Sequence, residues 1–433
     1  MRHWFKDQHM RSLLKNSSYL GASRIVAAIA SVATLAFTGR ALGVTMFGLL
    51  ILIHSYAQAA SSLSKFQSWQ VVVRYGGQGL AAGRPEDFKV ATGFSFGLDI
   101  LSGIIGMLLA MALLPLIGGW FGIPDQYLIA AVLYCTVIPT MQAMTPGGVL
   151  RTLDRFDLQS WAGITYPIAR MILAGIAFAA DAPFLAYLAI WYVTDLGGDL
   201  FLWWLTRREL KRHDMVDALR PTLKPHPLKG AWRFAIRVNL TSSLNAAWGP
   251  VARLLVGGLL GPAAAGFYNI ASTLADAAQK PTDLLARAFY PEVMRMDLRT
   301  KRPWKLMIRG AALAAMFGLV AVLLVAIAGE PLIALVFSDQ FTPAYSVLVV
   351  LVLAPLLAML SFPFEPMLYA LDRSAAPLKA RIVATATYFA IVAPLSWRFG
   401  VTGAAAAFVI GTAVMVGLLG VQLWREYRRV RAQ

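Results

Sequence analysis

Residues 39–50 read Gly-Arg-Ala-Leu-Gly-Val-Thr-Met-Phe-Gly-Leu-Leu. The Leu-Gly pair and the last glycine of this stretch recur 218 residues later, at Leu260-Gly261 and Gly266. The tripeptide Leu-Asp-Arg at 153–155 recurs at 371–373, with the same offset. Two unrelated motifs that share an offset of about half the chain indicate that one half is a copy of the other. In a membrane protein, such a duplication is typical of a transporter whose substrate path runs between the copies.

The composition is that of an integral membrane protein. Hydrophobic residues make up 58% of the 433 and charged residues only 14%, whereas an ordinary soluble domain carries about 25% charged residues. Apolar stretches of about 20 residues, the length that crosses a bilayer, recur along the whole chain. We therefore predict about twelve transmembrane helices, at residues 17–38, 44–64, 91–114, 126–147, 158–179, 184–205, 235–258, 263–287, 306–328, 343–363, 378–397 and 400–422.

Lysine and arginine side chains fix the orientation of these helices. They are concentrated before the first helix, after each even-numbered helix and at the end of the chain, whereas the other connections hold only Arg40 and Arg398. Because cytoplasmic loops collect such residues, both termini are predicted to lie in the cytoplasm. The net charge of +17 reflects this bias together with contact with anionic lipid. It therefore predicts membrane lipids, and not nucleic acid, as a partner.

The offset of the repeat sets the domain organisation. It spans six helices, and an even number means that both copies enter the membrane in the same direction. This predicts an all-α membrane protein with two six-helix bundles, related by a pseudo-two-fold axis along the membrane normal. The bundles are expected at 1–206 and 233–433, joined by a basic, proline-containing cytoplasmic linker at 207–232. The first part of the linker, 207–219, is predicted to form a short helix on the membrane surface.

Prolines inside the predicted helices repeat as well. Pro139 lies in the fourth helix and Pro355 in the tenth, 216 residues later. Proline kinks a helix because it removes a backbone hydrogen bond. Paired kinks would suit helices that bend during transport, and the alternative is that each proline only shapes local packing.

Three segments resemble the Wzx-type polysaccharide flippases of the multidrug/oligosaccharidyl-lipid/polysaccharide superfamily. Residues 254–271 (Leu-Leu-Val-Gly-Gly-Leu-Leu-Gly-Pro-Ala-Ala-Ala-Gly-Phe-Tyr-Asn-Ile-Ala) resemble the start of the second half of these exporters, and residues 39–50 resemble its first-half counterpart. Residues 335–345 (Leu-Val-Phe-Ser-Asp-Gln-Phe-Thr-Pro-Ala-Tyr) are similar to the loop before the tenth helix. One departure is visible: Ala252 precedes Arg253, where the family often has an acid.

The resemblance implies that the chain moves an oligosaccharide, linked by diphosphate to a long polyprenol, to the outer leaflet of a bacterial cytoplasmic membrane by alternating access. The anionic head needs a wide, hydrated and cationic path, while the tail stays in lipid. No bond is made or broken, so no catalytic residue, metal or cofactor is expected beyond a coupling proton or sodium ion. A glycan polymerase and a chain-length regulator are candidate partners, and the chain is predicted to be a monomer.

Arginines inside the predicted helices are the first site candidates, because buried charges are costly and usually face a cavity or a partner. Arginine keeps its charge at any relevant pH and binds phosphate through its planar fork. We predict that Arg24 and Arg253 line the central cavity and bind the diphosphate, with Arg170 a further candidate. The alternatives are snorkelling of the first two to headgroups and pairing of Arg170 with Asp195 or Asp199.

The second and eighth helices each carry a polar stripe at helical spacing. The two stripes are superposed by the repeat offset and consist of His54, Gln58, Ser61 and Lys65, and of Asp276, Lys280, Asp283 and Arg287. We predict that both stripes face the shared cavity, and that the first two residues of each contact substrate. The alternatives are a structural histidine and, in the eighth helix, neutral i,i+4 pairs near the cytoplasmic end.

Acids inside the helices could carry a coupling ion. They are Asp99, Asp195, Asp199 and Glu365. The carboxylates of Asp195 and Asp199 share one helical face at i,i+4, where like charges repel. We predict this pair as the ion-coupling site, and the alternative is that Arg170 neutralises it.

Other function classes fit the sequence less well. An enzyme that polymerises or ligates polysaccharide is expected to place catalytic residues in a large external loop, and the predicted external connections are short. The sequence shows no metal-ligand spacing, phosphate-cradling glycine loop or nucleophile motif. A cation-coupled multidrug exporter of the same superfamily is the nearest alternative. That branch commonly has an acid in its first helix, and residues 17–38 contain none.

Overall fold

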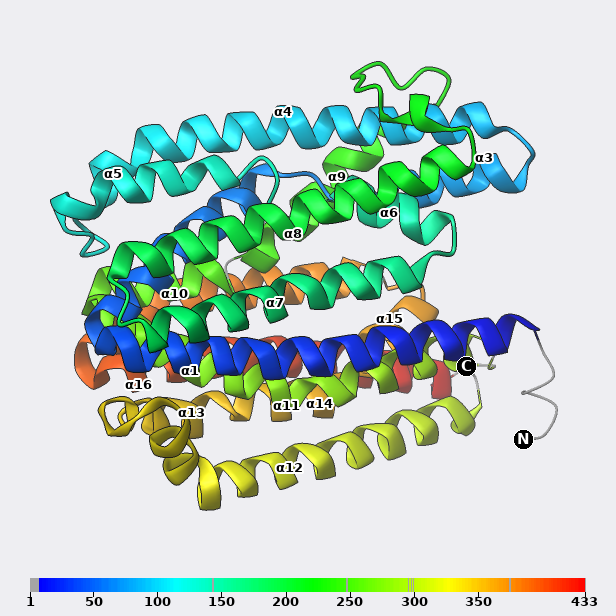
Figure 1. The fold of residues 1–433 in the computed structure, drawn as a ribbon. Helices are drawn as coiled ribbons and strands as arrows, with labels where there is room; N and C mark the ends of the chain where they lie inside the picture. The colour runs from blue at the N-terminus through cyan, green and yellow to red at the C-terminus, as the bar shows by residue number, and fades with distance from the viewer. Residues whose placement is uncertain are drawn as a thin grey trace. The chain divides into compact units, whose positions relative to one another are not determined.

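The computed structural model describes residues 8–141, 144–246, 248–294, 296, 298, 300–373 and 375–432. Side chains are described over the same ranges except for 8–22, 240–246, 280–288, 290–291 and 431–432. The elements within these ranges are helices, with no strand among them (Figure 1). Seven of the described helices are long and apolar enough to cross a membrane. The chain is therefore a multi-pass, all-α membrane protein, as its composition predicts.

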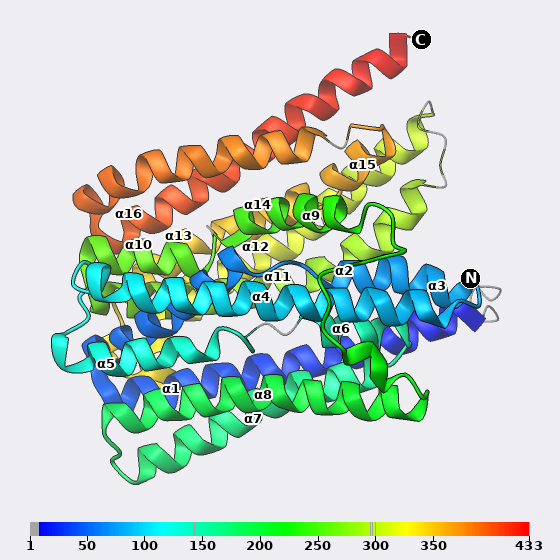
Figure 2. The same cartoon turned by 90° about the horizontal axis from the view of Figure 1, so that it is seen from above.

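Most of the predicted helices are present with longer ends. α1 (Gln8–Ser64) contains the first two, which meet at Gly43, and α16 (Ala375–Ala432) contains the last two, which meet at Gly400. The two arms of α16 are orange and red in Figure 2. Both glycines have a positive φ, 68° and 62°, a conformation that glycine adopts at no steric cost. The third, fifth, sixth, eighth and ninth predicted helices are α4 (Pro85–Ile117), α7 (Phe156–Ala179), α8 (Phe184–Arg212), α11 (Pro262–Met294) and α12 (Lys301–Phe337).

The remaining three predicted helices are interrupted. The fourth consists of α5 (Asp125–Tyr134), the 3₁₀ turn η3 (Cys135–Val137) and α6 (Met144–Thr152). The seventh consists of α9 (Ala231–Ala246) and α10 (Pro250–Leu260). The tenth consists of α13 (Ala344–Leu351) and α14 (Leu353–Ser361), and the short α15 (Phe364–Ala370) follows it. Pro139 lies between η3 and α6, and Pro355 lies in the first turn of α14, which confirms that both helices are interrupted near their prolines.

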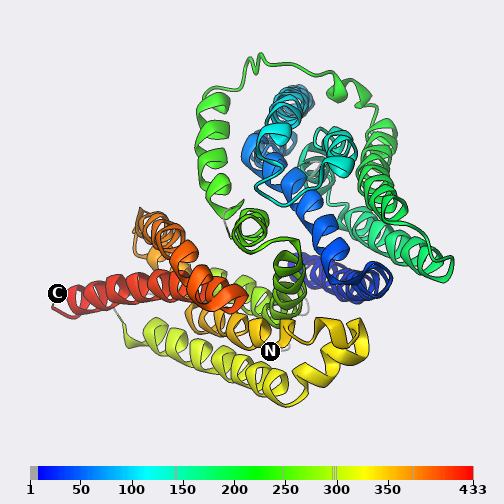
Figure 3. The ribbon, with the colours of Figure 1, turned by 90° about the vertical axis from the view of Figure 1, so that its left-hand side faces the viewer.

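Two connections between the predicted helices differ from the sequence prediction. The connection after α1 contains a continuous helical segment, made of α2 (Trp69–Val71), the π-helical turn η2 (Val72–Gly76) and α3 (Gly77–Ala81). The predicted surface helix at 207–219 is wrong, because α8 continues without a break to Arg212 and only a 3₁₀ turn, η4 (Val216–Leu219), follows. From there the chain (green in Figure 3) arches to the start of α9.

Residue contacts divide the chain into two units. The first comprises Met1–Leu42 and Ile53–Ala246, and the second comprises Gly43–Leu52 and Ala247–Gln433. In contrast to the predicted start of the second bundle at residue 233, α9 belongs to the first unit. It packs there through Ala231 and Ala235 on the buried side chains of Val71, Phe94 and Leu98. In the first unit α7 also packs along α8.

The duplication is visible in the backbone of each half. Positive φ angles occur in equivalent turns, at Gly43 and Gly261, at Gly122 and Ser338, and at Asp154 and Asp372. The separations are 218, 216 and 218 residues. Such conformations are uncommon outside glycine, so their recurrence at one offset supports a common origin of the two halves.

The repeated Leu-Asp-Arg tripeptide forms the same contact in both halves. Arg155 lies 2.5 Å from Oε1 of Glu209 in α8, and Arg373 lies 3.0 Å from Oε1 of Glu426 in α16. Only 5% and 6% of the two glutamate side chains are exposed. The tripeptide therefore ties the turn after a short helix to a buried acid in the last helix of the same half.

The repeated glycines allow a close helix approach inside the second unit. A Cβ on Gly48 would lie 1.8 Å from the carbonyl oxygen of Pro262, and a Cβ on Gly266 would lie 3.3 Å from the Cα of Gly48. Backbone atoms cannot rotate away from such a contact as a side chain can. Close packing of these two backbones thus explains why glycine recurs at both positions.

We expect Gly48→Ala to destabilise the protein by about 3 kcal/mol, the upper part of the usual cost of overpacking. Gly163→Ala in α7 is the matched control, because a Cβ there meets nothing within 4 Å; it is expected to have little effect or to stabilise α7 slightly. The measurement is the thermal midpoint of the purified protein in detergent. Equal midpoints for the two variants would contradict the packing role of Gly48.

Candidate functional site

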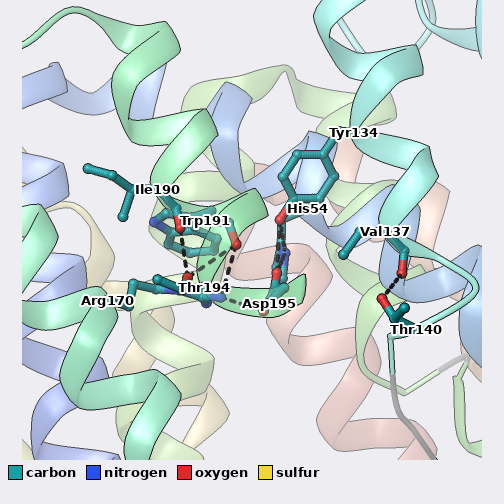
Figure 4. Close-up of polar contacts among 9 residues, drawn as sticks. All are labelled: His54, Tyr134, Val137, Thr140, Arg170, Ile190, Trp191, Thr194 and Asp195. Carbon is teal, nitrogen blue, oxygen red and sulfur yellow. Dashed lines mark hydrogen bonds and ion pairs between the residues drawn. The ribbon is translucent and has the colours of Figure 1, made fainter. Parts of the chain in front are cut away.

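A buried polar cluster lies inside the first unit (Figure 4). His54 comes from α1, Tyr134 from α5, Arg170 from α7 and Asp195 from α8. His54 and Arg170 are each 9% exposed, and the side chain of Asp195 is 12% exposed. We call these four residues the polar cluster. Ionisable groups at such depth are expensive and point to a functional role.

The guanidinium of Arg170 is fixed along one face of α8. It forms an ion pair with Oδ1 of Asp195 and donates from Nε to the hydroxyl of Thr194 at 2.7 Å. It also donates to the carbonyl of Trp191 at 3.3 Å, and its Cζ lies 4.7 Å from the centroid of the Trp191 ring. These contacts come from successive turns of one helix, so they set both the position and the plane of the guanidinium.

The second carboxylate oxygen of Asp195 faces two titratable groups. Oδ2 accepts a hydrogen bond from the hydroxyl of Tyr134 at 2.9 Å and lies 3.3 Å from Nδ1 of His54. Nδ1 is itself 3.0 Å from the Tyr134 hydroxyl. The His54 ring meets Trp191 edge to face at 4.8 Å. Asp195 thus has a permanent cation on one side and an imidazole with a phenol on the other.

This arrangement can hold or release one proton. When Nδ1 carries a proton, it can donate to Asp195, and when Nδ1 is bare, it can accept the proton of the Tyr134 hydroxyl. Imidazole is the side chain whose ordinary titration range lies near neutral pH. The chemistry available to the polar cluster is therefore proton uptake coupled to a rearrangement of hydrogen bonds between α1, α5 and α8.

The structure resolves one alternative that the sequence left open. Arg170 pairs with Asp195, whereas Asp199 lies one turn further along α8 and is half-buried. The sequence prediction did not include three residues of this site, because hydroxyl and indole groups within an apolar helix give no charge signal. They are Tyr134, Trp191 and Thr194. The coupling role of the two aspartates stays a prediction.

A second polar arrangement holds the interrupted fourth helix. Lys65 donates from Nζ to the carbonyl of Pro139 at 2.8 Å and to that of Met141. On the far side of the break, Asp99 accepts hydrogen bonds from the backbone N–H of Thr145 at 2.9 Å and from its hydroxyl at 2.7 Å. Ser68 donates to the other oxygen of Asp99 at 2.5 Å. Lys65 and Asp99 are 3% and 5% exposed.

The charges of Lys65 and Asp99 have the signs that the dipoles of the two half-helices favour. A cation lies at the carbonyl end of the first half-helix and an anion at the amide end of the second, which is the favourable order for both. Thr140 also donates to the carbonyl of Val137 at 3.0 Å (Figure 4). The break is therefore stabilised by named side chains on both of its sides.

The predicted polar stripe of the second helix faces the interior of the first unit. His54 and Lys65 make the contacts above, and Ser61 lies 3.4 Å from the carbonyl of Met141. Gln58 is half-buried and Asp276 is exposed. The side chains of Lys280, Asp283 and Arg287 lie outside the described residues. The substrate contacts predicted for the two stripes stay predictions.

The two arginines predicted to bind diphosphate lie in different units. Arg24 is exposed on the first arm of α1, and Arg253 is half-buried in α10. Arg253 donates from Nη1 to Oδ1 of Asn269 in α11 at 3.4 Å. Glu365 lies 3.3 Å from Arg381 and is thus paired. Within the described ranges, no three His, Cys, Asp or Glu side chains are arranged to hold a metal ion.

The chain is similar to known proteins over most of its length. The family described as "polysaccharide biosynthesis protein" matches residues 13–296. The inner membrane protein YghQ of Escherichia coli K12 is 41% identical over 350 residues, which cover 80% of this chain and 99% of that protein.

Solved structures share the fold at low sequence identity. An inward-facing multidrug resistance MATE transporter of the MOP superfamily gives a TM-score of 0.69 at 16% identity over 95% of both chains. A mutant of the Vibrio cholerae MATE transporter VcmN gives 0.65 at 13% identity over 98% of both chains. Lipid II flippase MurJ, in an inward closed conformation, gives 0.62 at 13% identity over 97% of this chain and 90% of that one. These matches confirm the predicted fold class.

Proposed function

The chain belongs to the polysaccharide biosynthesis protein family, and we propose that it moves a polyprenyl-diphosphate-linked oligosaccharide from the inner to the outer leaflet of a bacterial cytoplasmic membrane. The observation that carries this proposal is the family match combined with a fold that the chain shares with a lipid II flippase. The name of the similar Escherichia coli protein, an inner membrane protein, supports the location. Transport proceeds by alternating access, with both termini in the cytoplasm.

Arg24 and Arg253 bind the diphosphate in this proposal. A guanidinium binds phosphate oxygens through two parallel hydrogen bonds, and Asn269 fixes the orientation of Arg253. Gln58, Asp276 and Lys280 supply an amide, a carboxylate and an ammonium group, which are the groups that hydrogen-bond sugar hydroxyls. Arg170 and His54 have a different task, because the contacts above commit both to Asp195.

The polar cluster couples transport to a proton gradient. A sodium ion needs several oxygen ligands, yet Arg170 already occupies one oxygen of Asp195 and Tyr134 the other. A bound sodium ion would also face the positive charge of Arg170. A proton meets neither obstacle, because it can be exchanged between His54 and bulk water while the ion pair persists. Asp199, one turn along α8, supplies a second carboxylate on the same face.

A cation-coupled multidrug exporter is the second candidate, favoured by the TM-score of 0.69 with a MATE transporter. The two candidates differ in the charge of the cargo. A flippase needs cations such as Arg24 and Arg253 to bind its anionic head, whereas an exporter of cationic drugs is hindered by them.

We expect Arg24→Ala and Arg253→Ala each to lower glycan export about tenfold to hundredfold, since a hydrogen bond to a charged group contributes about 1.5–3 kcal/mol. The measurement is surface glycan in a flippase-null strain that carries each variant, with membrane protein levels quantified by immunoblot. Arg40→Ala, on the same arm of α1 as Arg24, is the control and retains export. Full export by both variants would reject the proposed role of these arginines.

A further inference from the structure

The connection between α1 and α4 carries a cation that the proposed transport cycle does not use. Arg74 lies in the π-helical turn η2, and its side chain is exposed. Its Cζ lies 4.5 Å from the centroid of the Phe234 ring in α9 and 5.5 Å from that of Tyr75. Single π-helical turns are rare and are frequently found at functional sites. Arg74 is thus held against two aromatic rings of the first unit.

The aromatic support of Arg74 is part of the core of that unit. The rings of Tyr75 and Phe234 meet edge to face at 5.9 Å, and both pack against the buried cluster that contains Val71 and Phe94. The hydroxyl of Tyr75 donates to the carbonyl of Lys229 at 3.4 Å. Because these groups are anchored, the guanidinium of Arg74 loses little conformational freedom when it binds a ligand.

Arg74 differs from two neighbouring arginines in its ionic contacts. Two other arginines in the connections of the first unit have carboxylate partners: Arg84 pairs with Asp87 at 3.3 Å and Arg220 with Asp217 at 2.9 Å. Arg74 makes no ion pair within the part of the chain that the structure describes. Stacking on a ring uses the face of a guanidinium and leaves its in-plane N–H groups to bind an anion.

The surface around Arg74 combines further cations with exposed apolar side chains. Arg233 is exposed at the start of α9, next to Phe234. Val73, Trp232 and Ile236 are 39%, 37% and 55% exposed. Trp232 also donates from its indole N–H to the carbonyl of Leu223 at 3.2 Å. An indole with one bonded polar edge and an exposed ring is typical of the membrane–water interface.

We propose that Arg74 and Arg233, with the rings of Tyr75 and Phe234, form a binding site for the phosphate of an anionic membrane phospholipid. Trp232 and Ile236 contact its acyl chains. A soluble phosphate ion would make no use of these two exposed apolar side chains, which is why the site fits a lipid. Basic groups beside a membrane attract anionic headgroups. The site includes neither Arg24 nor Arg253 and does not depend on which substrate is transported.

The test is the binding of a fluorescent short-chain phosphatidylglycerol to the purified protein in a neutral detergent. Arg74→Gln is expected to weaken this binding about tenfold, because one charge-assisted phosphate contact is lost. Arg84→Gln is the matched control: it removes the same charge from the same connection, at a residue paired with Asp87, and leaves binding unchanged. Phe234→Leu keeps the net charge and is expected to weaken binding a few-fold, because the cation–π support is lost.

Three results would overturn the proposal. The first is wild-type binding by both Arg74→Gln and Phe234→Leu. The second is an equal loss in Arg74→Gln and Arg84→Gln, which would indicate unspecific attraction by net charge. The third is displacement of the labelled lipid by polyprenyl diphosphate or inorganic pyrophosphate at lower concentration than by unlabelled phosphatidylglycerol. That result would assign the site to a diphosphate and not to a phospholipid.

Discussion

Asp195→Asn is expected to abolish export and to destabilise the first unit by about 3–5 kcal/mol, the cost of removing one partner of a buried ion pair. The variant leaves the guanidinium of Arg170, 9% exposed, without its carboxylate. It also removes the anion that lies 3.3 Å from Nδ1 of His54. The measurements are the thermal midpoint of the purified protein and the surface glycan of a complemented null strain.

The double variant Arg170→Gln/Asp195→Asn separates stability from transport. It removes both charges together, so neither is left buried without its partner, which is the costly situation. We therefore expect the thermal midpoint to recover while export stays absent, because no carboxylate remains beside His54. Glu365→Gln is the matched control. It breaks the Glu365–Arg381 pair, whose side chains are 32% and 26% exposed, so it costs about 1 kcal/mol or less and preserves export. If the double variant exported glycan at the wild-type level and still responded to the gradient, the polar cluster would have only a structural role.

Lys65→Met is expected to destabilise the protein by about 3–5 kcal/mol and to release the interrupted fourth helix. It leaves the carbonyls of Pro139 and Met141 without their ammonium donor, and buried polar groups that lose a partner are costly. Asp99, which is buried, also loses its electrostatic interaction with the Lys65 ammonium. Thermal midpoints measure the first effect. Hydrogen exchange of the backbone amides of residues 138, 140–141, 145 and 147–149 measures the second.

Lys89→Met is the control for Lys65→Met. The Lys89–Glu86 pair spans 2.7 Å, but 75% of the glutamate side chain is exposed. Such a surface pair contributes about 0–1 kcal/mol, so the midpoint should change little. The backbone amides of residues 138, 140 and 141 could exchange as slowly in Lys65→Met as in Lys89→Met. That result would show that Lys65 does not stabilise the break.

The sequence predicted long helices well because each gives a strong signal. The runs at 91–114 and 158–179 are apolar over a bilayer's width, and they correspond to α4 and α7. The break between α9 and α10, at Trp248 and Gly249, falls inside the helix predicted at 235–258. It was not predicted, although Pro250 marks the start of α10. The helical segment at Trp69–Ala81 was not predicted either, because it is too short and too polar to give a membrane signal.

The site was predicted in part. Arg170 and Asp195 stand out because charges are rare in apolar helices, but periodicity alone could not decide between Asp195 and Asp199, which share a face. Tyr134 carries no comparable signal, although it bridges His54 and Asp195. Periodicity also placed Lys65 on a polar face without identifying the neighbour that this face meets. That neighbour, the break after η3, depends on how the fourth helix folds back on α1 and α4.

The central claim is transport of a lipid-linked oligosaccharide driven by protons. Its most direct test is the reconstitution of the purified protein in liposomes that contain a fluorescent polyprenyl-diphosphate oligosaccharide, with a quencher confined to one side of the membrane. Proton-driven transport predicts that a proton gradient accelerates movement of the labelled sugar between leaflets, and that Arg170→Gln/Asp195→Asn reduces this movement to the level of protein-free liposomes. Gradient-driven movement of a cationic dye, with the labelled sugar left in its original leaflet, would contradict it.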